Sequence, residues 1–75
     1  MIYYNDNKDK CIDITCYCRA KHCSGELIVQ PDTIKGEKVF MITAIDTRGN
    51  DEASLWITKD QIDILINELR ELINV

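Results

Sequence analysis

The chain has 75 residues, of which 45% are hydrophobic and 29% charged, and its formal net charge is −4. A chain of this length supports one small domain, since it buries only about 60% of the surface that its unfolded form exposes. No apolar run approaches the roughly 20 residues of a membrane span, and the first ten residues hold no apolar stretch of signal-peptide length. We therefore expect a cytoplasmic protein that does not enter a membrane.

The charge distribution narrows the class of partner. The basic residues are scattered among Asp and Glu, whereas a nucleic-acid binder normally presents a basic face, because phosphate neutralisation supplies most of its affinity. This pattern favours a protein or a small molecule as the partner over nucleic acid.

Four strand-length runs rich in β-branched and aromatic residues follow an N-terminal segment of ten residues. They are CIDITCYC (11–18), GELIVQ (25–30), EKVFMITAID (37–46) and EASLWIT (52–58). The turn signals are Ser24-Gly25, Gln30-Pro31-Asp32, Lys35-Gly36 and Gly49-Asn50. Residues 11–58 are therefore predicted to form a four-stranded antiparallel sheet in which consecutive strands are neighbours.

A helix is predicted to follow the sheet, because the apolar period changes from 2 to 3.6. The apolar residues at helical spacing are Ile62, Leu65, Ile66, Leu69, Leu72 and Ile73. Thr58 and Gln61 have the spacing of a capping box, and Ile57 and Ile62 that of a hydrophobic staple. Residues 59–74 are therefore assigned as the helical segment of the domain. Within it, the amphipathic helix is predicted over about residues 59–73.

The order of these elements predicts an α+β fold, ββββα, a β-meander with the helix packed on one sheet face. In the first hairpin, a four-residue loop at 19–22 sets Ile14 opposite Leu27, which brings the apolar residues onto one face. In the second hairpin, a two-residue turn sets Ala44 opposite Leu55. The face that carries Ala44 and Leu55 also carries the staple residue Ile57, so we expect the helix on that side.

The opposite face is predicted to stay exposed, because one helix covers only one face of the sheet. Its apolar residues are Tyr17, Ile28, Val39, Met41, Ile45 and Trp56. A contiguous exposed apolar patch on a small protein typically marks an interaction site. We therefore predict a homodimer that forms through this face; the alternative is partial cover by Ile2, Tyr3 and Tyr4.

Three of the four cysteines are predicted to lie together at the closed end of the first hairpin. Cys16, Cys18 and Cys23 share one face there, roughly 4.5–7 Å apart, while Cys11 lies on the other face. With His22, these three could form a Cys3His zinc site.

We favour a different interpretation of the cysteines. Cys16 and Cys18 continue the alternation of Ile12 and Ile14, so they are interpreted as small buried hydrophobes, and no bound cofactor is expected. A Cys18–Cys23 disulfide is disfavoured, because the cytosol keeps thiols reduced.

Catalysis finds little support in the sequence. His22 and Cys23 are adjacent, so on an extended chain their side chains point to opposite faces and cannot act as base and nucleophile. The chain also lacks the glycine-rich motifs that bind phosphates. We expect a small non-enzymatic regulator or inhibitor that binds another protein, and its Ile-, Asn-, Lys- and Asp-rich composition would suit an AT-rich bacterial or phage genome.

One family resemblance suggests an alternative. The ββββα order, in which a strand runs into a Thr-capped helix at ITKDQ (57–61), looks like the single-strand-binding transcription coactivator family over about residues 37–75. This resemblance implies a single-stranded nucleic-acid-binding module that dimerises through its helix and sheet. A small binding domain stabilised by zinc is the second alternative.

Overall fold

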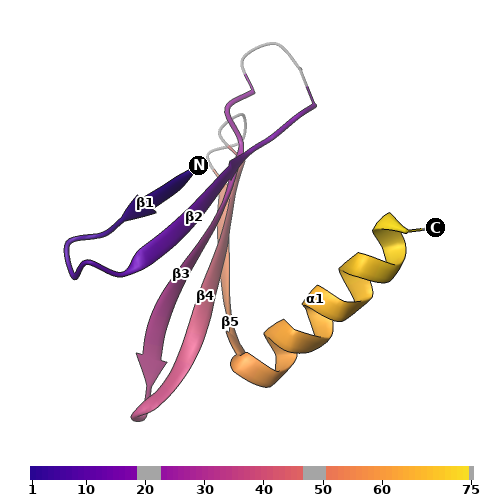
Figure 1. Ribbon diagram of the computed structural model, residues 1–75. Coiled ribbons are helices and arrows are strands. Elements are labelled where there is room, and N and C mark those ends of the chain that lie inside the picture. The colour runs from indigo at the N-terminus through magenta and orange to yellow at the C-terminus, as the bar shows by residue number, and fades with distance from the viewer. Residues whose placement is uncertain (19–22, 47–50, 75) are drawn as a thin grey trace.

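The computed structural model describes residues 1–18, 23–46 and 51–74. It contains a five-stranded antiparallel sheet followed by one C-terminal α-helix (Figure 1). The elements are β1 (Ile2–Tyr4), β2 (Lys10–Thr15), β3 (Glu26–Ile34), β4 (Glu37–Asp46), β5 (Asp51–Thr58) and α1 (Lys59–Ile73). Each strand pairs with the next one along the chain. The α+β meander with a C-terminal helix is thus confirmed, with one strand more than the four expected.

The additional strand, β1, lies at the N-terminal edge of the sheet. It pairs with β2, with Tyr3 opposite Cys11, rather than lying across a face of the sheet. The Asn5 side chain stabilises the turn between the two strands, because its Oδ1 accepts hydrogen bonds from the backbone N–H groups of Asn7 (3.0 Å) and Asp9 (2.9 Å). A strand of three residues is too short to show an alternating pattern, which is why the sequence did not predict it.

The strand β3 is longer than predicted. The turn expected at Gln30-Pro31-Asp32 is wrong, because β3 continues through Pro31 and the chain turns into β4 at Lys35 and Gly36. Beyond Val29, β3 pairs with β4 alone, so Pro31 lies in an edge segment. Proline is tolerated at such a position, because its missing N–H can face away from the ladder.

The first long hairpin, between β2 and β3, has the predicted register. Ile14 lies opposite Leu27 and Ile12 opposite Val29. However, β2 ends at Thr15, three residues before the end of the predicted strand. The cysteines at 16 and 18 therefore follow the strand instead of belonging to it.

The register of the β4–β5 hairpin differs from the prediction by two residues. Ala44 lies opposite Ala53, and Leu55 lies opposite Ile42. The last pair is Asp46 with Asp51, so the connection is four residues long rather than two; the predicted Gly49-Asn50 turn lies outside the described residues. A shift of two residues leaves every side chain on its predicted face.

The register assigns the side chains of the sheet to two faces. The Val39 face carries Tyr3, Cys11, Asp13, Ile28, Gln30, Asp32, Val39, Met41, Thr43, Ile45, Ser54 and Trp56. The Phe40 face carries Ile2, Tyr4, Ile12, Ile14, Leu27, Val29, Phe40, Ile42, Ala44, Ala53, Leu55 and Ile57. The Val39 face mixes polar and apolar side chains. The Phe40 face is apolar over the middle of the sheet, and Lys10, Thr33, Lys38, Asp46 and Asp51 lie toward its ends.

The helix α1 begins where predicted, at the capping box. The Gln61 N–H donates to Thr58 Oγ1 at 3.2 Å, and the Thr58 N–H donates to Gln61 Oε1 at 2.9 Å. The helix contacts β4 and β5 and then diverges from the sheet toward its C-terminal end (Figure 1). None of its described residues is buried, and Leu65 and Leu69 in its apolar stripe are 43% and 44% exposed.

The chain is more open than a compact monomer of its size. Its radius of gyration is 14.1 Å, whereas a compact 75-residue domain has about 11 Å. Its accessible surface is 6,329 Å², whereas a folded monomer of this mass exposes about 4,700 Å². The chain thus exposes roughly 1,600 Å² more surface than a compact monomer of its mass.

Candidate functional site

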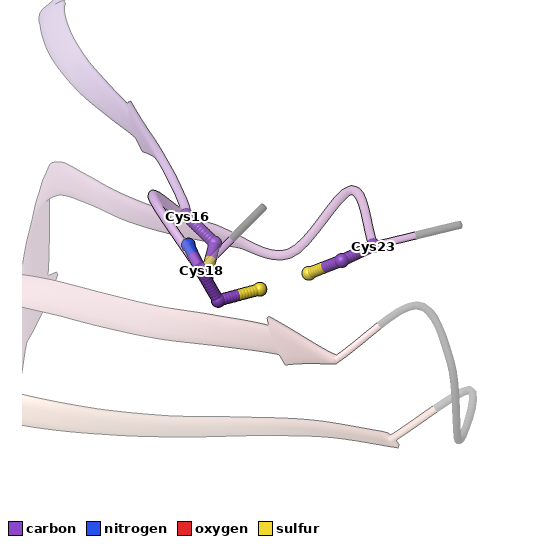
Figure 2. A group of neighbouring side chains, drawn as sticks. All are labelled: Cys16, Cys18 and Cys23. Carbon is purple, nitrogen blue, oxygen red and sulfur yellow. The ribbon is translucent and has the colours of Figure 1, made fainter. Parts of the chain in front are cut away.

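The side chains of three cysteines lie close together at the end of the sheet where β2 ends and β3 begins. Cys16 and Cys18 follow β2, and Cys23 precedes β3. The three sulfur atoms lie within 4.8 Å of one another. Figure 2 shows the Cys18 and Cys23 side chains extending toward each other from two separate segments of the chain. Three thiols this close together can bind a metal ion.

These cysteines are not the buried hydrophobes that the sequence favoured. Cys16 and Cys18 are exposed, and Cys23 is half-buried. The reason is the early end of β2 at Thr15, which places Cys16 and Cys18 beyond the strand, where the sheet no longer shields them. Burial in a core therefore does not account for this cluster.

The backbone holds the cluster in place. The Cys16 N–H donates to the Gly25 carbonyl at 2.8 Å, and this bond continues the β2–β3 pairing by one residue in the predicted register. The Cys18 N–H donates to Cys16 Sγ at 3.4 Å. A Cβ at Gly25 would lie 3.1 Å from the Ile45 carbonyl oxygen and 3.8 Å from Cys23 Sγ. Glycine at this position thus preserves the close approach of the chain to the Ile45 carbonyl of β4, next to the cysteines.

The thiol of Cys23 is affected by its neighbours. A backbone hydrogen bond from Gly25 lowers the pKa of Cys23. The hydrogen bond with Cys18, burial, and the nearby Cys16 all raise it, and together they leave the pKa of Cys23 above its usual value. Both other cysteines of the cluster thus contribute to the raised pKa of Cys23.

Cys11 and His22 stand apart from this group in different ways. Cys11 is fully buried on the Val39 face, and its thiol donates to the Asp9 carbonyl at 3.5 Å. Its separation from the other three cysteines is as predicted. His22, the predicted fourth ligand, lies outside the described residues.

The predicted interaction face, the Val39 face, is less exposed than expected. Val39 is 6% exposed, and Thr43, four residues further along β4 on the same face, is 5% exposed. Ile28, Met41 and Ile45 are half-buried, while Trp56 and Tyr17 are exposed. The expectation of an open patch is therefore wrong for Val39.

Polar side chains on the Val39 face bond to one another across the strands, which is why this face is partly closed. The indole of Trp56 donates to Asp32 at 2.8 Å, and the hydroxyls of Thr43 and Ser54 are 2.9 Å apart. These four polar side chains are thus bonded within the sheet.

The opposite face, the Phe40 face, is the exposed apolar surface of the described sheet. Ile14 and Leu55 are each 53% exposed, Ile12 is 42% exposed, and Leu27 is 37% exposed. These side chains lie on the face predicted from the sequence, but the helix does not bury them as predicted. The reason is the path of α1, which contacts only β4 and β5 and leaves β2 and β3 uncovered.

A groove of about 540 Å³ crosses the Phe40 face at the end remote from the cysteines. Its apolar lining includes Tyr4, Ile12, Val29, Pro31 and Phe40, and its basic lining consists of Lys8, Lys10 and Lys38. Two aromatic rings and three lysines thus lie around one hollow, together with the carboxylate of Asp9. Sequence reasoning missed this combination, because Lys38 and Phe40 are about thirty residues from Tyr4, Lys8 and Lys10 in the chain.

Comparison of the chain with models of protein families, with curated proteins and with solved structures finds no match. Among residues 1–18, 23–46 and 51–74, no helix has the length and apolar character needed to cross a membrane.

Proposed function

We propose that this chain is a non-enzymatic interaction protein of the cytoplasm, a regulator or inhibitor that binds other protein chains through its Phe40 face. The observation that carries this proposal is the exposed apolar surface on β2, β3 and β5, exemplified by Ile14, Leu27 and Leu55. A soluble monomer rarely exposes a contiguous apolar patch of more than a few hundred square ångströms. Burying this surface against another chain would therefore stabilise the fold as well as form the complex.

A second copy of the chain is the occupant that the areas favour. The additional surface of roughly 1,600 Å² per chain is about twice the 800 Å² that one partner buries in a standard interface. The apolar stripe of α1, in which Leu65 and Leu69 are over two-fifths exposed, also needs cover. A two-fold pair buries the same surfaces on both copies. It is therefore the simplest way to cover the Phe40 face and the apolar stripe of α1 together.

The experiment that tests this proposal is a measurement of mass in solution. Light scattering at micromolar concentration should give twice 8.7 kDa for the wild-type chain. A mass of 8.7 kDa throughout that range would contradict self-association and leave a foreign protein as the occupant of the Phe40 face.

Binding of single-stranded nucleic acid is the second candidate function, and one observation favours it. Tyr4 and Phe40 line the same groove as Lys8, Lys10 and Lys38, and a base could stack on such rings while its phosphates approach the lysines. The net charge of −4 argues against this function. Filter binding of a single-stranded oligonucleotide at two salt concentrations separates the candidates, because nucleic-acid binding should weaken strongly with salt.

A further inference from the structure

The cysteine cluster is a feature that protein binding through the Phe40 face leaves unexplained. Cys11 fits the usual role of a free cysteine as a small buried hydrophobe, since none of its surface is exposed. The three others are two exposed thiols and one half-buried thiol, brought together from the two sides of a chain connection. Their positions call for an explanation based on thiol chemistry rather than packing.

The spacing of the sulfurs fits a metal ion. Zinc binds thiolate sulfur at about 2.3 Å with tetrahedral geometry, which places neighbouring sulfurs about 3.8 Å apart. The sulfurs of Cys16, Cys18 and Cys23 lie within 4.8 Å of one another, so shifts of roughly 1 Å would complete the geometry. The three exposed or half-buried side chains can make such movements without disturbing a core.

The surrounding backbone is also suited to holding charged sulfur. The Cys18 N–H points at Cys16 Sγ from 3.4 Å, and a donor in this position stabilises a thiolate. The bond between Cys16 and Gly25 fixes the two strand ends that carry the ligands. Gly25 also lets the chain approach β4 closely beside them, because a Cβ there would lie 3.1 Å from the Ile45 carbonyl oxygen, whereas its 3.8 Å distance to Cys23 Sγ would be an ordinary contact.

A disulfide is a weaker explanation of the cluster. It would join two of the three sulfurs and leave the third thiol without a role, and it would need an oxidant. A metal ion engages all three sulfurs at once, because each one loses a proton to solvent and becomes a ligand.

We propose that Cys16, Cys18 and Cys23 bind one Zn²⁺ through three thiolates, with water or another external ligand in the fourth position. Sulfur ligands select soft or borderline ions such as zinc over magnesium or calcium. The ion links the end of β2 to the start of β3 and so stabilises the end of the sheet that α1 does not reach.

Zinc titration of the reduced, metal-free full chain tests this site. In competition with a chromophoric chelator, the wild type should bind one zinc ion per chain. Loss of an outer-shell partner alone typically lowers metal affinity about 10–100-fold, so Cys16→Ser, Cys18→Ser and Cys23→Ser should each lower it at least as much. Cys11→Ser is the matched control, because it also removes one thiol and should leave the stoichiometry and affinity unchanged.

Alkylation of the wild-type chain tests the same site without any variant. With zinc, iodoacetamide should spare Cys16, Cys18 and Cys23; after chelation it should modify all three, as located by mass spectrometry. The proposal is overturned if the chain takes up no zinc, if zinc fails to protect these three thiols, or if the three serine variants bind zinc as tightly as the wild type.

Discussion

Across the Val39 face, Nε1 of Trp56 on β5 donates a hydrogen bond of 2.8 Å to Oδ2 of Asp32 on β3. The strand β4 lies between these two residues, with Val39 opposite Asp32 and Met41 opposite Trp56. The bonded pair therefore bridges over β4. This bridge explains why Val39 is 6% exposed on a face that the sequence predicts to be open.

The bridge predicts a pKa effect that can be measured. The pKa of Asp32 lies below its ordinary value, because the Thr33 N–H and then the Trp56 indole N–H donate hydrogen bonds to its charged form. In Trp56→Phe the indole donor is lost, so the pKa of Asp32 should rise toward the ordinary value. An NMR titration of the Asp32 carboxyl carbon measures this shift, and identical midpoints in the two proteins would contradict the bridge.

The lowered pKa of Asp32 also predicts how the stability of the fold changes with pH. The pKa of Asp32 is lower in the folded than in the unfolded chain, so its carboxylate stabilises the fold at pH values above the ordinary Asp pKa. This contribution is lost as the pH falls through the lowered folded-state pKa. Trp56→Phe should therefore reduce the dependence of stability on pH in the acid range, as measured by urea unfolding at a series of pH values.

The capping box of α1 provides a prediction about stability. Thr58→Ala removes the oxygen that accepts the Gln61 N–H, so the free energy of unfolding should fall by about 1 kcal/mol. In a domain of this size, that loss lowers the melting temperature by roughly 4–8 °C. Thr58→Ser keeps an acceptor oxygen and serves as the control. If Thr58→Ala and Thr58→Ser melt alike, the cap contributes nothing.

The helix start was predictable from the sequence because its determinants are local. Thr58 and Gln61 bond to each other within one turn, whatever the rest of the chain does. The pairing of Ile14 with Leu27 was likewise predictable, because the alternation of apolar residues admits only registers that keep them on one face. The β4–β5 register was not predictable in this way, because Ala44 remains on the same face whether Leu55 or Ala53 lies opposite it.

The candidate sites were predictable only in part. The register brought Cys16, Cys18 and Cys23 together correctly, but their exposure depends on where β2 ends, and the alternating pattern continues past that point. The exposed face depends on the path of α1, which is a property of tertiary packing and not of the helical pattern of Leu65 and Leu69.

The β3–β4 turn provides a second prediction about stability. Lys35 and Gly36 have φ angles of 52° and 78°, so both central residues are left-handed, as in a type I′ turn. Gly36→Ala should destabilise the fold by about 1–2 kcal/mol through backbone strain alone, because a Cβ there meets no atom within 4 Å. Lys35→Asn should instead stabilise the fold, because Asn tolerates the left-handed backbone conformation better than Lys does. Chemical denaturation measures both, and equal effects of the two substitutions would contradict the turn.

Two neighbouring residues of β5 distinguish the faces through which the chain could self-associate. Leu55 on the Phe40 face and Trp56 on the Val39 face are 53% and 47% exposed, so each offers a similar contact to a partner. A fully buried aliphatic side chain contributes about 1.5–3 kcal/mol, and a buried carboxylate without a partner costs more than that gain. Leu55→Glu should therefore convert the dimer into monomer at micromolar concentration.

Trp56→Glu is the matched control for Leu55→Glu, because it places the same charge one residue further along the same strand. It breaks the hydrogen bond with Asp32 and brings two carboxylates together, so it should lower the melting temperature. It should nevertheless leave the mass at twice that of the chain, because Trp56 faces away from the Phe40 face. Light scattering of both variants decides between the faces. A monomeric Trp56→Glu beside a dimeric Leu55→Glu would place the interface on the Val39 face.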